Sequence, residues 1–142
     1  MDNIDTFNKF AAAFEDAVED DDWSRLEQYL AEDATYLNVG GPDPKSEGSA
    51  AVIAFLKADV ANTDRRFESR NLIALTPPVT EGERLSRQWR CTYSIADAPD
   101  LVVEGEARYL FGNGLIKKIE EEVTVDAKKV LGEWMEKYGG RL

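Results

Sequence analysis

Consecutive segments with alternating apolar and polar residues dominate the second half of the chain. They span 66–75, 84–95, 101–111 and 115–125, with turn signals at Pro77-Pro78 and Glu81-Gly82. The sequence GNG joins the last two and is a strong hairpin signal. Because side chains alternate between the two faces of a strand, each segment can bury only one face. The pattern therefore predicts an antiparallel meander whose apolar face must be covered by other parts of the chain.

The first half of the chain is predicted to supply that cover. Apolar residues recur at helical spacing in three segments, 4–18, 23–30 and 49–60, and Asp22 and Ser49 are the expected caps of the second and third helices. An early strand at 34–39 and a Gly/Pro loop at 40–48 lie between them. Helices gathered on one side of an antiparallel sheet make an α+β fold, and a sheet that curls around them encloses a pocket.

The chain is predicted to end in one more helix. Asp126 is its expected cap, its apolar residues are Val130, Leu131, Trp134 and Met135, and Gly139-Gly140 ends it. The length of 142 residues suits one domain, 1–142, with a single core.

Composition excludes several kinds of partner. The chain has 28 acidic and 17 basic residues and a net charge of −11, so its surface repels nucleic acid and anionic lipid. No apolar run reaches membrane-spanning length, and the N-terminus does not resemble a signal peptide. Cys91 is the single cysteine, so no internal disulfide can form, and we expect a cytoplasmic protein. Histidine is absent, which removes the commonest general base and the commonest metal ligand, so we expect no metal site.

Alternation along the strands decides which side chains face the expected pocket. Tyr36 and Asn38 share a face of the early strand. In the later segments the less polar face should point inward, and it carries Arg87, Trp89, Cys91 and Tyr93, then Val103, Gly105, Ala107, Tyr109 and Phe111, then Ile119, Glu121, Val123 and Val125. Such aromatic residues are often plain core. Together with Tyr36 and Asn38, however, they supply hydrogen-bond donors that a purely apolar core would avoid.

Glu121 is the one carboxylate on an apolar face. A run of three acids, Glu120 to Glu122, is commonly a solvated strand edge, and this interpretation stays open. Alternation separates the middle acid from its two neighbours. A carboxylate on an apolar wall should have a raised pKa or a paired cation, and Arg87 is the candidate partner.

Several local strings resemble the nuclear transport factor two-like superfamily, which includes ketosteroid isomerase and SnoaL-like polyketide cyclases. They are Asp22-Trp23 with Leu26, then YLAEDATYLNVGG, EGSAAVIAFL and RYLFGNGLIKKI, in the order typical of that superfamily. The resemblance implies a cone-shaped fold, in which a strongly bent mixed or antiparallel sheet wraps around N-terminal helices and encloses a deep apolar pocket. It also implies frequent homodimers and, for the SnoaL-like cyclases, activity without a cofactor.

The same resemblance argues against steroid isomerisation. Ketosteroid isomerase uses an aspartate base, with a tyrosine and a protonated aspartic acid as its oxyanion hole. By the resemblance, the base falls on Asn38, the tyrosine on Phe14 and the protonated acid near Ala107. An amide cannot take up a proton at neutral pH, and phenylalanine has no hydroxyl to donate. That mechanism is therefore not expected here.

Two hypotheses of different class remain. In the first, the chain is an isomerase, cyclase, dehydratase or hydrolase for a small apolar or aromatic, polyketide-like molecule, with Glu121 as catalytic acid or base. The expected ligand-binding residues are Phe14, Tyr36, Asn38, Arg87, Trp89, Tyr93, Ala107, Tyr109, Ile119 and Val123. In the second, the chain is a non-catalytic binding or dimeric interaction module, in which Asn38 hydrogen-bonds the turn at Gly40-Gly41. The expected dimer contact is the outward sheet face with Gln88, Arg90, Thr92, Glu104, Glu106 and Arg108.

Overall fold

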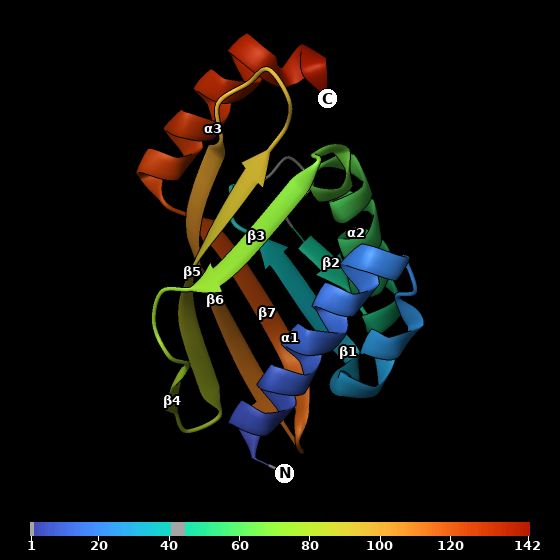
Figure 1. Cartoon of the computed structure of the whole chain (residues 1–142). Helices are drawn as coiled ribbons and strands as arrows, with labels where there is room; N and C mark the ends of the chain where they lie inside the picture. Colours follow the sequence, from blue (N-terminus) through green and yellow to red (C-terminus); the bar gives the residue numbers. More distant parts are fainter. Residues whose placement is uncertain (1, 41–44) are drawn as a thin grey trace.

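The structure is a computed structural model that describes residues 2–40 and 45–142. Figure 1 shows its elements, which follow in chain order. They are α1 (Asn3–Asp20), the short 3-10 helix η1 (Ser24–Tyr29), β1 (Leu30–Asn38), β2 (Lys45–Glu47), α2 (Ser49–Asn62), η2 (Asp64–Arg66), β3 (Ser69–Ala74), β4 (Val79–Glu81), β5 (Arg84–Ser94), β6 (Leu101–Gly112), β7 (Leu115–Val123), α3 (Val125–Tyr138) and η3 (Gly139–Arg141).

The strands form one seven-stranded sheet in the order β2-β1-β7-β6-β5-β3, with β4 paired to β5. The pair β1–β7 is parallel and the other pairs are antiparallel, so the sheet is mixed. The sheet is strongly curved, with α1 and α2 against its concave side and α3 near one end (Figure 1). The predicted α+β fold with a bent sheet around N-terminal helices is confirmed.

The meander forms because its sequence matches strand geometry at every step. Residues of β6 alternate between buried and less buried along its whole length, so one face of the strand builds core. Asn113 and Gly114 connect β6 to β7, with φ of 54° and 76°. Positive φ at both central residues of a two-residue loop matches the right-handed twist of the flanking strands. The hairpin that the sequence GNG predicted is therefore confirmed.

Aromatic side chains on α1 and α3 pack against aromatic side chains elsewhere in the fold. Phe7 and Phe10 of α1 pack edge-on against Tyr109 of β6, with ring centroids 5.0 and 6.2 Å apart. Trp134 of α3 packs on Phe67, with centroids 5.4 Å apart, within a second cluster of buried residues. Burying large aromatic side chains contributes most of the stability at such contacts. These contacts hold α1 against the concave face of the sheet and α3 near one end of it.

Several predicted boundaries differ in the structure. Thr124, rather than Asp126, caps α3, because its hydroxyl accepts a hydrogen bond from the backbone N–H of Ala127 at 3.1 Å. Val125 consequently begins the helix, is 83% exposed and does not continue the inward face of β7. Gly48 is the N-cap residue of α2, and Ser49, the predicted cap, is its first helical residue. Ile4, the first apolar residue of the predicted helix 4–18, is 36% exposed.

The structure has two strands that were not predicted, one strand that begins earlier, and two, β3 and β7, that are shorter than predicted. β1 begins at Leu30, and the short strands β2 and β4 pair with β1 and β5. The predicted loop at 40–48 lies partly outside the described residues, and its described remainder includes β2. Short edge strands escape detection because three residues carry too little alternation. Within the described residues, no helix combines the length and apolarity that crossing a membrane requires.

Candidate functional site

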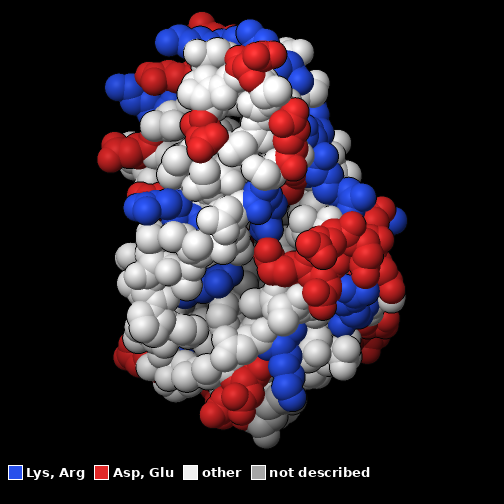
Figure 2. All heavy atoms as spheres, in the orientation of Figure 1, with Lys and Arg blue, Asp and Glu red and all other residues white. Residues whose placement is uncertain are grey.

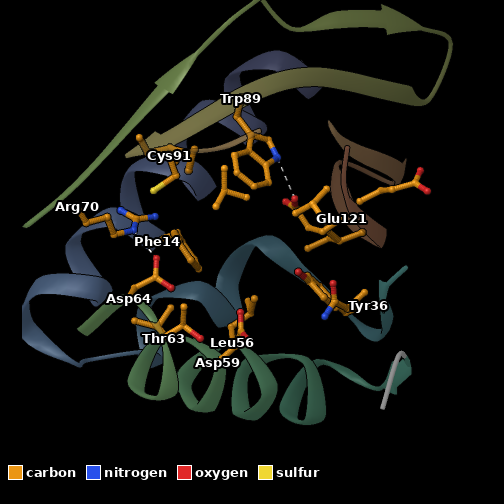
Figure 3. A pocket seen from close by; sticks show the side chains of 18 of the residues that line it. Phe14, Tyr36, Leu56, Asp59, Thr63, Asp64, Arg70, Trp89, Cys91 and Glu121 are labelled. Carbon is orange, nitrogen blue, oxygen red and sulfur yellow. Dashed lines mark hydrogen bonds and ion pairs between the residues drawn. The ribbon is translucent and has the colours of Figure 1, made fainter. Parts of the chain in front are cut away.

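A pocket of about 610 Å³ lies between the concave face of the sheet and the helices α1 and α2. All but one of the predicted site residues line it: Phe14, Tyr36, Asn38, Arg87, Trp89, Tyr93, Tyr109, Ile119, Glu121 and Val123. Figure 3 shows Trp89 and Glu121 on the sheet side, with Leu56 and Asp59 of α2 opposite them. Alternation in the sequence thus predicted the lining of the pocket, because strand faces are set locally.

Four predicted site residues occupy one row across the sheet: Asn38 of β1, Glu121 of β7, Ala107 of β6 and Arg87 of β5. Directly paired residues on adjacent strands point to the same face. Ala107 is fully buried and does not line the pocket, so the structure does not support its assignment as a ligand contact.

Trp89 holds the Glu121 carboxylate from two strands away. Its indole Nε1–H donates a hydrogen bond to Glu121 Oε2 at 3.1 Å (Figure 3). To reach β7, the indole crosses β6 at Gly105, which pairs with Trp89 in the sheet register. A Cβ at Gly105 would lie 2.5 Å from Trp89 Cζ2, closer than real Cβ atoms approach other atoms. Only glycine therefore permits this indole position.

The carboxyl of Glu121 has a pKa shifted towards neutral pH. Burial raises the pKa of its carboxyl from the ordinary 4.5 to about 7, although the charge of Arg87 and the hydrogen bond from Trp89 oppose the rise. A carboxyl with this pKa is present in both forms at neutral pH. The sequence predicted either a raised pKa or a paired cation for this carboxyl, and the raised pKa agrees with the first alternative. No ion pair within the described residues joins Arg87 to Glu121, so Arg87 acts on it only through its field.

The two neighbouring acids behave differently. Glu120 and Glu122 accept hydrogen bonds from Arg108, at 3.2 Å each, and Glu120 also pairs with Lys118 at 2.7 Å. These pairs match the interpretation of the acidic run as a solvated strand face. That interpretation fails for Glu121 alone, because its side chain points the other way.

Three uncharged donors lie on the same face of the sheet as the Glu121 carboxyl. Burial raises the pKa of the Tyr36 and Tyr109 hydroxyls, and the nearby charge of Glu121 raises both further, so each keeps its proton at neutral pH. Neither hydroxyl, nor the side-chain amide of Asn38, has a hydrogen-bond partner among residues 2–40 and 45–142. The predicted bond from Asn38 to the turn at Gly40-Gly41 involves Gly41, which lies outside the described residues. These groups are available to an oxygen of a bound molecule.

A second polar cluster, at the opposite end of the pocket, was missed in the sequence. Arg70 of β3 donates to Glu15 of α1 at 2.6 Å and to Asp64 of η2 at 2.5 Å, and the Tyr93 hydroxyl donates to Asp64 at 3.3 Å. Figure 3 shows Arg70 and Asp64 across the cavity from Glu121. The alternation of Arg70 with Leu72 in β3 was the available signal, since both line the pocket. Within the described residues, no three His, Cys, Asp or Glu side chains are arranged to hold a metal ion.

Comparison with known proteins places the fold. The TerC structure, co-crystallized with polyporic acid, is similar with a TM-score of 0.67 and 12% identity over 92% of this chain and 98% of that one. An NTF2-like protein of unknown function from Burkholderia pseudomallei has a TM-score of 0.67 and 16% identity over 94% and 98%. An M. tuberculosis LEH-like epoxide hydrolase has a TM-score of 0.63 and 16% identity over 94% of each chain. Such identities show a shared fold alone.

The sequence itself matches a family. No curated protein is significantly similar to it. The model of the SnoaL-like domain, however, matches residues 11–119, which include the second half of α1, the strand with Tyr36 and Asn38, and most of the meander. The chain therefore belongs to the SnoaL-like domain family and has the NTF2-like fold.

Proposed function

We propose that the protein is an enzyme that moves protons on a small, partly apolar carbonyl compound, with Glu121 as its general acid and base. One observation carries this proposal: the Glu121 carboxyl lines a pocket, is held by Trp89 and has a pKa of about 7. An acid–base catalyst works best when its pKa lies near the operating pH. A carboxylate alone can supply this chemistry.

The geometry favours proton abstraction next to a carbonyl group. Ionised Glu121 takes the proton, the C–H electron pair moves towards the carbonyl oxygen, and an O–H bond forms on the carboxyl. The Tyr36 and Tyr109 hydroxyls and the Asn38 amide are neutral donors on the same wall and would stabilise the resulting oxyanion. Return of the proton to a different carbon gives an isomer, and attack of the carbanion on a second carbonyl group closes a ring.

The size and lining of the pocket support a small organic ligand. The volume of about 610 Å³ lies in the usual range for small-molecule sites. Apolar side chains, including Phe14, Leu56 and Leu72, face its interior and suit an aromatic or polyketide-like body. TerC, with the same fold, was co-crystallized with polyporic acid, and another similar structure is an LEH-like epoxide hydrolase. Both support a small-molecule role for the pocket.

Hydrogen exchange tests the proposal without a known substrate. Phenylacetone and phenylpyruvate share a phenylmethyl ketone with exchangeable protons, and NMR in D₂O reports their exchange rates. We expect the wild-type protein to accelerate exchange of at least one of them, Glu121→Gln to abolish this, and Glu120→Gln to retain it. Equal acceleration by wild type and Glu121→Gln would refute the role of Glu121. Binding of either ketone without any acceleration would favour the non-catalytic module.

We further propose a cytoplasmic homodimer joined through the outward face of β5 and β6. On this face Arg90 pairs with Glu104 at 2.7 Å, and the side chain of Val102 is 40% exposed nearby. A contact of this kind would bury an apolar centre inside a polar rim.

A further inference from the structure

We propose that the ligand of the pocket carries a carboxylate and that the guanidinium of Arg87 binds it. This inference deepens the proposed function, because it names the substrate class of the same pocket: a keto acid with an apolar body. The observation behind it is a cation that lines the pocket without a counter-ion among the described residues.

The charge of Arg87 is not balanced by a protein carboxylate. None of the ion pairs among residues 2–40 and 45–142 includes Arg87. Its Nε atom is buried and has no hydrogen-bond partner within the same residues. A buried polar group without a partner is costly, and a buried charge more so. A ligand carboxylate at the Nη groups would compensate the charge of this guanidinium.

The other cations of the pocket lack this property. Arg70 is held by both Glu15 and Asp64, and its side chain is only 13% exposed, so its charge is already compensated. Lys128 of α3 also lines the pocket but is exposed to solvent, where a lone ammonium is well hydrated. Arg87 is therefore the cation best placed to select a ligand by charge.

The surroundings of Arg87 suit a planar anion. Its guanidinium lies 5.0 Å from the centroid of the Phe7 ring, a cation–π contact that orients the group. A guanidinium presents parallel N–H donors that match the two oxygens of a carboxylate. Its Nε is enclosed by the protein, so the two Nη groups, which form no hydrogen bond within the described residues, are the donors that a ligand could reach.

The position of Arg87 relative to Glu121 fits a keto acid. Arg87 and Glu121 share one sheet row, separated only by Ala107 on β6. Two strand spacings amount to about 9–10 Å between backbones, and both long side chains shorten that gap. A carboxylate on Arg87 would therefore leave the adjoining carbonyl and its acidic C–H bond close to Glu121.

The surface charge of the protein does not favour a carboxylate ligand. The chain has a net charge of −11, and Figure 2 shows acidic side chains gathered over the C-terminal end of α1, beside a hollow in the surface. This field opposes the approach of an anion. Recognition of a carboxylate must then come from a local contact inside the pocket, and Arg87 provides it.

Binding of a matched acid and amide tests the inference. The probes are 3-phenylpropionate and 3-phenylpropionamide, which differ only in the charged group, with dissociation constants measured by calorimetry or NMR. We expect wild type to bind the acid about tenfold or more tightly than the amide. Arg87→Met should remove this preference, and Arg87→Lys should retain part of it. The control Arg84→Met removes an exposed arginine from the opposite face of β5 and should leave the preference unchanged.

The results separate this inference from the proposed function. NMR spectra of the variants show whether each remains folded, and Arg87→Lys keeps the charge if Arg87→Met unfolds. Equal affinity for acid and amide in wild type, a preserved preference in Arg87→Met, or no binding of the acid would overturn the inference. Glu121→Gln should keep the preference for the acid while it loses proton exchange, so either idea can fail alone.

Discussion

Replacing Glu121 with glutamine should stabilise the folded protein above neutral pH. Folding raises the pKa of this carboxyl from 4.5 to about 7, mainly because burial disfavours its charged form. Each pH unit between the two values corresponds to about 1.4 kcal/mol. Ionised Glu121 therefore lowers the free energy of unfolding by about 3 kcal/mol at most, since water in the open pocket reduces the penalty. Glutamine keeps the shape and an acceptor for Trp89 but never ionises.

The sign of the effect sets the pH window. Below pH 4.5 the carboxyl is protonated in both the folded and the unfolded chain, so the pH-dependent difference between the two proteins vanishes there. Between pH 4.5 and about 7 the folded protein holds a proton that the unfolded chain has lost, so wild-type stability falls as pH rises. The gap should be complete near pH 8.

Urea denaturation followed by tryptophan fluorescence measures this gap from pH 4.5 to 8.5. Glu120→Gln is a matched control with the opposite sign, because hydrogen bonds from Lys118 and Arg108 lower the pKa of Glu120. Removing that carboxylate should weaken the protein at neutral pH rather than stabilise it. A stability difference between wild type and Glu121→Gln that stays constant across the range would refute a raised pKa at Glu121.

Three further predictions follow from the same geometry. Gly105→Ala should destabilise the protein by about 1–3 kcal/mol in urea denaturation and displace the Trp89 indole, which its fluorescence reports; an unchanged fluorescence spectrum would contradict the close approach. Trp89→Phe removes the N–H donor that lies 3.1 Å from Glu121 Oε2 and should raise the pKa of Glu121 further, by about one unit. A ¹³C NMR titration of the carboxyl measures this pKa, with Trp134→Phe as the control. An unchanged or lower pKa in Trp89→Phe would count against the hydrogen bond. Sedimentation should show a dimer at micromolar concentration that Arg108→Glu weakens, whereas a wild-type monomer would exclude the proposed contact.

An ionisable group whose pKa is shifted far from its ordinary value is a common mark of a functional site. The row of Asn38, Glu121 and Arg87 breaks the apolar pattern of the sheet on three separate strands. A core built only for stability would place apolar residues there. The protein gives up stability to keep an ionisable carboxylate in the pocket. The stability gained by Glu121→Gln would measure how much.

Prediction from the sequence succeeded where the physical cause is local. Alternation along β5, β6 and β7 identified the inward faces, because neighbouring side chains on a strand must point in opposite directions. The same rule separated Glu121 from Glu120 and Glu122. Helix caps were less certain, because Thr124 and Asp126 are both good caps and only the end of β7 decides between them.

The sequence by itself determined the α+β class, the curved-sheet family and most of the pocket lining. Only the tertiary structure decided which of those residues touch. Trp89 reaches Glu121 because the indole passes over Gly105, while Arg87 remains unpaired although it shares a row with the same carboxylate. The Arg70 cluster unites residues from α1, η2 and β3. These contacts depend on the curvature of the sheet and on the seating of α1 and α2, which no local pattern encodes.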